Sequence, residues 1–237
     1  MKTKLAGILA GLLGLALMSA SASAGTINFS DSFNPPSSQW NNYSGNWTAS
    51  GGQYYATQAS NTPSAVTQLP FNLSDFTVTV TANNLTDGGI VLHGNGTSSN
   101  AVLLVLGGNG YGQGVRGGTA GSSIYWLDGG ANQNEVDGVF TPGSTYNIKV
   151  TVVGNVYSAY INGSSTAVST FTTSLYPTGT VGLYDDQPNT AGGGSGAPMT
   201  FSNFSLSGTT VPEPSSLGLL AAFGFALLRR WRSPVGS

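Results

Sequence analysis

The sequence predicts an all-β protein in which two antiparallel sheets pack face to face as a β-sandwich. Apolar and polar residues alternate along much of the chain, most clearly over 76–81 and 146–152, a pattern typical of strands with one buried face. Turn residues separate these runs, and Gly154-Asn155 predicts a two-residue hairpin because both residues tolerate a positive φ. No segment between residues 25 and 210 keeps a helical apolar period. We therefore expect about ten or more strands in two packed sheets.

The expected strands follow one another at short intervals. Residues 76–81, 146–152 and 200–206 are assigned because they alternate, the last with one irregular step. Shorter runs rich in β-branched or aromatic residues, which favour strands, complete the set: 89–93, 101–106, 124–127, 156–161 and 180–184. Glycine-containing turn signals lie between the strands, at 87–89, 128–130, 142–143, 154–155 and 162–163.

The N-terminus has the three parts of a secretory signal peptide. Lys2 and Lys4 precede an apolar run over 5–17, and small residues follow, with Ala22 and Ala24 in the small-x-small pattern that signal peptidase accepts. Cleavage there would leave Gly25 as the new N-terminus. An uncleaved membrane anchor is the alternative, but the apolar run is only about 20 Å long as a helix, short for a hydrocarbon core of ~30 Å.

The C-terminus also has three parts. A Pro-Glu-Pro motif precedes an apolar stretch over 217–228, and a basic end follows; the motif and the arginines are Pro212, Glu213, Pro214, Arg229, Arg230 and Arg232. Basic residues directly after an apolar helix hold that end in the cytoplasm. Residues 211–233 closely resemble the PEP-CTERM sorting signal of Gram-negative bacteria. The resemblance implies a short transmembrane helix before processing, and cleavage by an exosortase in organisms that make exopolysaccharide. A plain tail anchor is the alternative.

Composition excludes several classes of function. Charged residues make up 7% of the chain, against about 25% in a typical soluble protein. Cysteine is absent and His93 is the single histidine, which excludes thiolate and multi-histidine metal centres. Between residues 25 and 210 only Arg116 and Lys149 remain against eight acidic residues, a balance of 2 − 8 = −6. Such a body has no electrostatic attraction to nucleic acid or to anionic lipid headgroups.

A second resemblance covers residues 26–207. The opening at 29–33, followed by Trp40 and Trp47, the strand at 88–93 and the closing segments at 146–153, 157–163, 179–184 and 201–204 resemble concanavalin A-like jelly-roll domains of the laminin-G-like type. This resemblance implies a jelly-roll sandwich with Trp40 and Trp47 in its core. Because the same fold carries lectins, glycosidases and structural modules, it does not by itself imply a function. The chain thus divides into a leader (1–24), a sandwich (25–208) and a sorting signal (209–237).

No catalytic group is indicated by spacing. Glu135 and Asp137 match the first two positions of the Glu-x-Asp-x-(x)-Glu strand of glycosidases on this fold, but the second glutamate is missing and retaining hydrolysis needs a carboxyl pair. His93 with Ser98 or Ser99 lacks a Gly-x-Ser-x-Gly elbow. We expect His93 to end a strand with its ring half exposed.

Calcium is the metal that the sequence favours. The segment 128–137 concentrates the hard oxygen ligands that calcium takes, namely Asp128, Asn132, Asn134, Glu135 and Asp137. The alternative is that these are solvated turn residues selected for backbone geometry.

Glycan binding requires flat aromatic rings beside amides and carboxylates. One candidate group surrounds the acidic segment, and a second lies at the end of the strand 180–184. Together the candidates are Tyr111, Arg116, Tyr125, Trp126, Asp128, Tyr184 and Asp185.

These observations predict a protein exported across the inner membrane, transiently anchored, and then held at the cell surface or in the extracellular matrix. Its expected partners are signal peptidase, an exosortase-type protease and extracellular polysaccharide, which it binds or co-assembles with without catalysis. Two alternatives remain: a glycoside hydrolase or lyase with an unrecognised carboxylate pair, and a purely structural matrix protein that pairs with copies of itself.

Overall fold

The computed structural model describes residues 24–60, 63–108, 121–129, 131–186 and 198–211. The body, Gly25–Val211, forms one compact unit. Most of the predicted leader, including Ala22, and the whole sorting motif lie outside the described residues. Over the part that is described, no helix is long and apolar enough to cross a bilayer.

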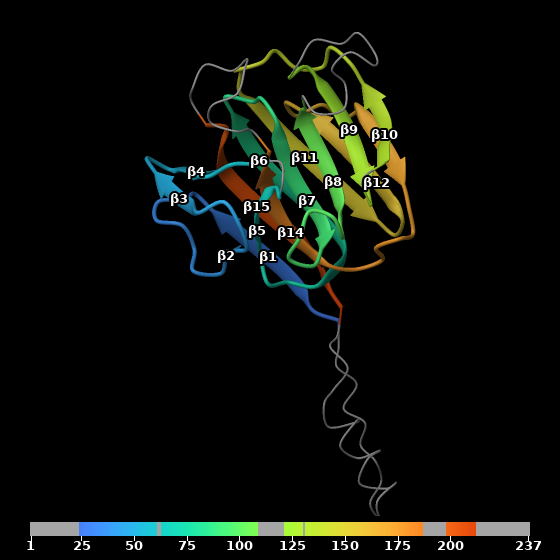
Figure 1. The fold of residues 1–237 in the computed structure, drawn as a ribbon. Helices are drawn as coiled ribbons and strands as arrows, with labels where there is room; N and C mark the ends of the chain where they lie inside the picture. Colours follow the sequence, from blue (N-terminus) through green and yellow to red (C-terminus); the bar gives the residue numbers. More distant parts are fainter. Residues whose placement is uncertain (1–23, 61–62, 109–120, 130, 187–197, 212–237) are drawn as a thin grey trace, which may run out of the picture. The chain divides into compact units, whose positions relative to one another are not determined.

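Two antiparallel sheets form the body (Figure 1). The eight-stranded sheet has the order β13 (Ser169–Thr172), β12 (Val156–Ile161), β11 (Tyr146–Val153), β6 (Leu73–Asn83), β15 (Thr200–Thr210), β4 (Gln53–Ala56) and β3 (Trp47–Ser50), with β1 (Thr26–Asp31) also paired to β15. The seven-stranded sheet has the order β10 (Ala131–Val136), β9 (Ser123–Asp128), β8 (Val102–Gly107), β7 (Gly88–Gly94), β14 (Thr180–Asp185), β5 (Ala65–Gln68) and β2 (Asn41–Asn42). The predicted all-β, two-sheet antiparallel sandwich is therefore confirmed.

The main core lies between the sheets and follows from the alternation in the sequence. On β6 and β11, the inward residues Val78 and Val80 pair with Val150 and Ile148, and all four are fully buried. Their outward neighbours are threonine, lysine and asparagine. Because successive side chains of a strand point to opposite faces, one register buries Val78, Val80, Val150 and Ile148 together and leaves their polar neighbours outside.

Aromatic residues close one end of the core. Trp40 and Trp47 are both buried, as the family resemblance implies. Phe33 stacks on Tyr54 with 4.7 Å between ring centroids. The buried Asp31 carboxylate accepts hydrogen bonds from the Trp40 indole N–H at 2.8 Å and from the backbone N–H of Phe33 at 2.6 Å, so its charge is compensated where β1 ends.

His93 departs from the expectation of a half-exposed ring, because only 2% of its surface is exposed. It has a positive φ of 49° where the pairing of β7 with β14 shifts register, and its ring lies among core groups. Nδ1 lies 2.7 Å from the Tyr157 hydroxyl and Nε2 lies 3.0 Å from the Ser74 carbonyl oxygen. Burial lowers the pKa of His93 below its usual value. The residue has a structural role, with tyrosine rather than serine as its side-chain partner.

Candidate functional site

Trp126 is a core residue, and its predicted role in glycan binding is wrong. Its side chain is fully buried on β9, with ring centroids 6.0 Å from Tyr157 and 6.1 Å from Phe171. The indole N–H donates to the Ser169 hydroxyl at 2.9 Å. A ring enclosed in this way has no face left for a sugar.

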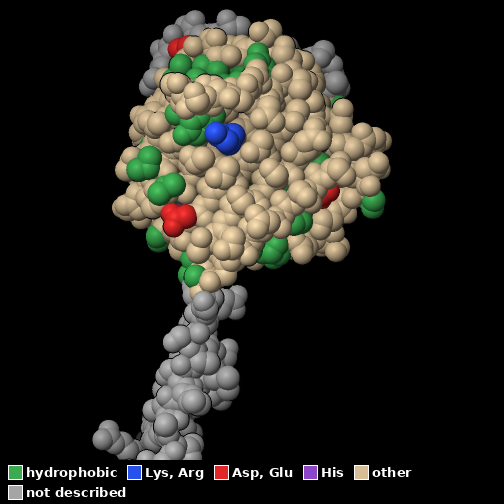
Figure 2. Space-filling model, turned by 180° about the vertical axis from the view of Figure 1, so that it is seen from behind, with side chains coloured by type: hydrophobic (Ala, Val, Ile, Leu, Met, Phe, Trp, Pro, Cys, Tyr) green, Lys and Arg blue, Asp and Glu red, His purple; other side chains and the backbone are tan. Residues whose placement is uncertain are grey.

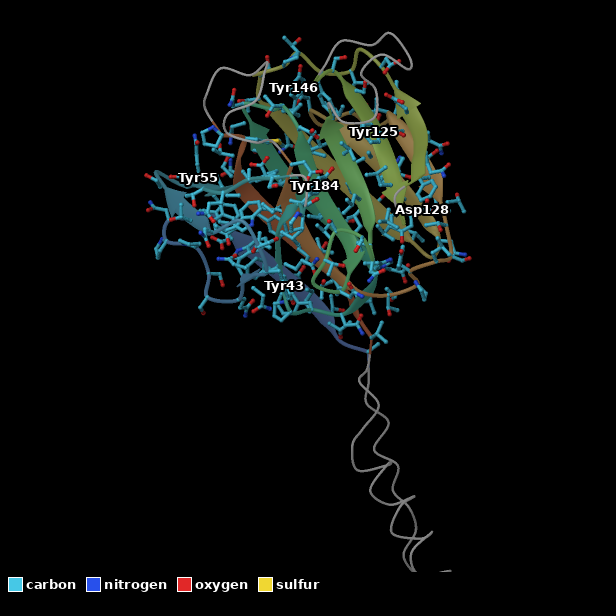
Figure 3. The ribbon with its side chains drawn as sticks, viewed as in Figure 1. Tyr43, Tyr55, Tyr125, Asp128, Tyr146 and Tyr184 are labelled. Atoms are coloured by element: carbon cyan, nitrogen blue, oxygen red, sulfur yellow. The ribbon has the colours of Figure 1, made fainter. Side chains whose placement is uncertain are left out.

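The two predicted tyrosines are also buried, in a second hydrophobic cluster on the outer side of the seven-stranded sheet. Tyr125 is 3% exposed and Tyr184 0%, and both belong to the cluster that contains Val91 and Leu103; Figure 3 labels the two tyrosines. Asp185 is buried as well, whereas Asp128 is partly exposed at the end of β9. These buried side chains do not form the predicted aromatic rim.

Tyr111 and Arg116, the other two predicted glycan residues, lie outside the described residues.

The predicted calcium ligands are not brought together either. Residues 128–137 form the β9–β10 hairpin, in which Asp128 pairs with Ala131. Asp137 accepts a hydrogen bond from Ser123 at 2.7 Å, at the opposite end of β9, so it lies about 17 Å along the strand from Asp128. Asn134 instead donates to the Thr170 carbonyl at 2.6 Å.

This separation means that Asp128 and Asp137 cannot bind the same ion, and Asn134 is engaged elsewhere; the side chain of Asn132, another predicted ligand beside Glu135, lies outside the described part of the structure. Among the described side chains, no group of three or more histidine, cysteine or acidic residues is placed to hold a metal.

An acidic corner lies where β14 ends beside the start of β7; it consists of Asp87, Tyr184, Asp185 and Asp186. The backbone N–H of Asp186 donates to the Asp87 carbonyl at 3.1 Å. Burial raises the pKa of the Asp186 carboxyl to about 6, although a hydrogen bond from Ser64 opposes the shift. Burial, followed by the negative charge of Asp186, holds the pKa of Tyr184 well above its usual value. Asp186 is thus a carboxyl group that exchanges its proton near neutral pH.

The outer side of the eight-stranded sheet is an open surface that the sequence analysis did not identify as a site. Six uncharged polar residues form a row, one from each of six neighbouring strands: Asn28, Ser207, Thr77, Thr151, Ser158 and Thr170. The adjacent row contains Ser30, Ser205, Thr79, Lys149 and Tyr160. We call these two rows the polar face.

Every residue of the polar face is exposed or half-buried. At ordinary strand spacing the six-residue row is about 24 Å long. Figure 2 shows one basic group near the middle of this side and a few acidic groups toward its edges; Lys149 is the one lysine or arginine among the described residues. The alternating threonines of 77–81 indicate an outward polar face on this strand. The row across six strands, however, depends on the order of the strands in the eight-stranded sheet.

Tyr43 is an exposed aromatic residue that the sequence analysis also missed. Half of its surface, 52%, is open. It lies close to Gly96, where a Cβ atom would come within 2.8 Å of the tyrosine ring. The sequence feature that could have identified it is the run of residue types common in turns around it, Asn41-Asn42-Tyr43-Ser44-Gly45. Such segments lie at the surface.

Comparison with known proteins identifies a fold class and no family. No family model matches the chain, and no curated protein matches it. Among solved structures, a Bacillus subtilis protein of unknown function with a galectin-like fold is 11% identical, with a TM-score of 0.56 over 79% of this chain and 98% of that one. The carbohydrate-binding module CBM66 from Bacillus subtilis is 13% identical, with a TM-score of 0.52 over 70% and 93%.

The exoplasmic/lumenal domain of VIP36, in its form bound to Ca²⁺ and Man2, is 11% identical, with a TM-score of 0.51 over 80% of this chain and 90% of that one. At these identities the likeness shows the fold alone: the body is a galectin-like β-sandwich.

Proposed function

We propose that this protein is an exported surface or matrix protein that binds extracellular polysaccharide without cleaving it. The observation that carries the proposal is the polar face, an open and nearly uncharged surface of hydroxyl and amide groups across six strands. The fold is also that of the CBM66 module and of the VIP36 domain in its Man2-bound form, which supports a carbohydrate partner.

The chemistry of the polar face suits a long polymer better than a single sugar. Each hydroxyl can both donate and accept a hydrogen bond, as can the hydroxyls of a saccharide. A single exposed hydrogen bond contributes only about 0.5–1.5 kcal/mol. Useful affinity therefore requires a chain that crosses several strands, and repeated contacts along it act by avidity.

Export and sorting are the other half of the proposal. The proposed leader ends at Ala24, so the mature chain would begin at Gly25, and the Pro-Glu-Pro motif starts directly after Val211. Inside the body these two points are neighbours, because the Gly25 backbone N–H donates to the Thr210 hydroxyl at 2.9 Å and Thr26 pairs with Thr209 (Figure 1). Every described strand lies within 26–210, so removal of residues 1–24 and of the segment after Val211 would leave the sheets whole, whereas the predicted start of the sorting signal at 209 lies inside β15.

The binding proposal predicts that the full chain, in a mild detergent, binds polysaccharides on a glycan array without releasing reducing sugar. Substitution of Thr77 and Thr151 by valine should weaken that binding about three- to tenfold, because two hydroxyls are lost while side-chain shape is kept. Thr48→Val, on β3 at the sheet edge and outside the polar face, is the matched control. Binding unchanged by the double substitution would reject the polar face as the binding surface.

Two other results would favour the alternatives. Sugar release that disappears in Asp186→Asn would favour a hydrolase, since a carboxyl with a pKa near 6 is suited to donate a proton. Self-association without any glycan binding would favour a purely structural matrix protein.

The sorting proposal predicts a shortened mature protein. Mass spectrometry of surface material should find Gly25 as the first residue and no arginine tail after the Pro-Glu-Pro motif. Replacing Glu213 with alanine should leave the tail attached if this motif directs cleavage. An intact C-terminus in wild-type surface material would contradict processing and leave a simple anchor.

A further inference from the structure

Lys149 occupies an unusual position in the polar face. It projects from β11, the third strand in from the sheet edge, with Thr79 as its cross-strand partner on one side and Tyr160 on the other. Its ammonium nitrogen lies 4.1 Å from the centre of the Tyr160 ring. The attraction between the cation and the ring face, about 0.5–1 kcal/mol at an exposed site, favours this orientation of a long, flexible side chain over the sheet.

No carboxylate of the described residues forms an ion pair with Lys149. The nearest acidic residue on the same side of β6 is Asp75, four positions from Thr79, or about 13 Å along the strand. That distance exceeds the Debye length of about 8 Å at physiological ionic strength. The positive charge of Lys149 is therefore not neutralised by its neighbours.

The remaining acidic residues of the body lie away from this face. Asp31 is buried, and the others belong to the acidic corner or to the β9–β10 hairpin of the seven-stranded sheet: Asp87, Asp185, Asp186, Asp128, Glu135 and Asp137. The net negative charge of the body is thus carried elsewhere. The polar face itself is neutral except for one central cation.

We propose that Lys149, held by Tyr160, is an anion subsite that selects polysaccharides carrying carboxylate groups, that is, uronate units. The inference rests on the proposed polysaccharide binding and adds the class of sugar. A uronate carboxylate would accept a charge-assisted hydrogen bond from the ammonium group. Neighbouring sugar units would meet Thr77 and Thr151 in the adjacent uncharged row, and Thr79 and Ser205 in the row of Lys149 itself.

A second copy of this chain is the competing source of a carboxylate, because its own acidic residues could reach Lys149. The polar face favours the polymer. Its rows of hydroxyl groups extend across six strands and complement the hydroxyls of a saccharide along their whole length.

The test compares two polymers with the same backbone. Polygalacturonate carries a carboxylate on every unit, and its fully methyl-esterified form carries none. We expect the full chain in mild detergent to bind polygalacturonate more tightly, and this preference to weaken when sodium chloride is raised to about 0.5 M. Lys149→Gln should lower affinity for polygalacturonate about fivefold and leave affinity for the ester unchanged.

Matched variants separate charge from shape. Lys149→Arg and Tyr160→Phe keep the cation and the ring and should retain the preference, whereas Tyr160→Leu should reduce it. Thermal unfolding checks that each variant is folded.

The inference would be overturned if Lys149→Gln kept the wild-type preference for polygalacturonate over its methyl ester. It would also be overturned if sedimentation showed that Lys149→Gln loses dimers while its polymer binding is unchanged. Binding of neutral glycans alone would also overturn it while the proposed function stands. Failure of the wild type to bind any polysaccharide would reject the proposed function.

Discussion

Replacing Trp126 with alanine is expected to destabilise the protein by about 3–5 kcal/mol, the range for loss of a large buried aromatic side chain. The indole is fully buried between Tyr157 and Phe171, so its removal leaves a cavity where β9 meets β12 and β13. It also removes a donor from Ser169. Because a domain is stable by only about 5–15 kcal/mol, the urea midpoint should fall severely.

Trp126→Phe is the matched control for this prediction. It keeps an aromatic ring in the site, and the Ser169 hydroxyl still donates to the Asn134 carbonyl at 3.0 Å. The expected cost is about 1–2 kcal/mol. If Trp126→Ala instead left stability unchanged and abolished glycan binding, the placement of Trp126 in the core would be refuted and its original assignment as a ligand residue restored.

The strands in which polar and apolar residues alternate could be predicted because one face of each strand is apolar and the other is polar. In β6, Val78 and Val80 face the core while Thr77 and Thr79 face outward, and the same pattern gave β11. The two-sheet architecture followed, since several half-apolar strands without helices must cover one another's apolar faces. Trp40 and Trp47 were placed correctly by family resemblance rather than by pattern.

The prediction of the candidate site residues was wrong where a strand is buried on both faces. In β9, Ile124, Tyr125 and Trp126 are all buried, so alternation could not separate ligand-facing from core-facing rings. The segment 131–136 read as an acidic loop because its residues are polar, yet it pairs with β9 at the sheet edge. Residues close in sequence were therefore taken to be close in space.

The polar face was not predicted from the sequence, for the opposite reason. Asn28, Thr77 and Ser207 are far apart in the sequence, and they become neighbours only because β15 inserts between β1 and β6. Strand order is set by long-range packing. No local pattern encodes it.

The raised pKa of Asp186 leads to a pH-dependent prediction that sequence could not supply. Burial favours the neutral carboxyl in the folded state and raises its pKa from the ordinary 3.8 to about 6. The folded state thus holds this proton more tightly than the unfolded chain. The resulting stabilisation is fully present below about pH 4 and is lost as pH rises through about 6.

Asp186→Asn should therefore raise stability at pH 7.5 and have little effect at pH 4. The amide is neutral at both pH values, and its oxygen can still accept the hydrogen bond from Ser64. A shift of about two pKa units corresponds to about 3 kcal/mol, which partial exposure of the group reduces to about 1–3 kcal/mol. The melting temperature should rise by about 2–12 °C at pH 7.5, at about 2–4 °C per kcal/mol for a domain of this size.

Comparing variant with wild type at each pH removes the opposite contribution of His93, whose lowered pKa makes acid destabilising. Asp128→Asn, at a partly exposed carboxyl, is the control and should change the melting temperature by less than about 1 °C at either pH. An equal gain for Asp186→Asn at pH 4 and 7.5 would show that the benefit does not come from titration of this carboxyl. A loss at pH 7.5 would mean that the Asp186 charge is stabilised by its surroundings, contrary to a raised pKa.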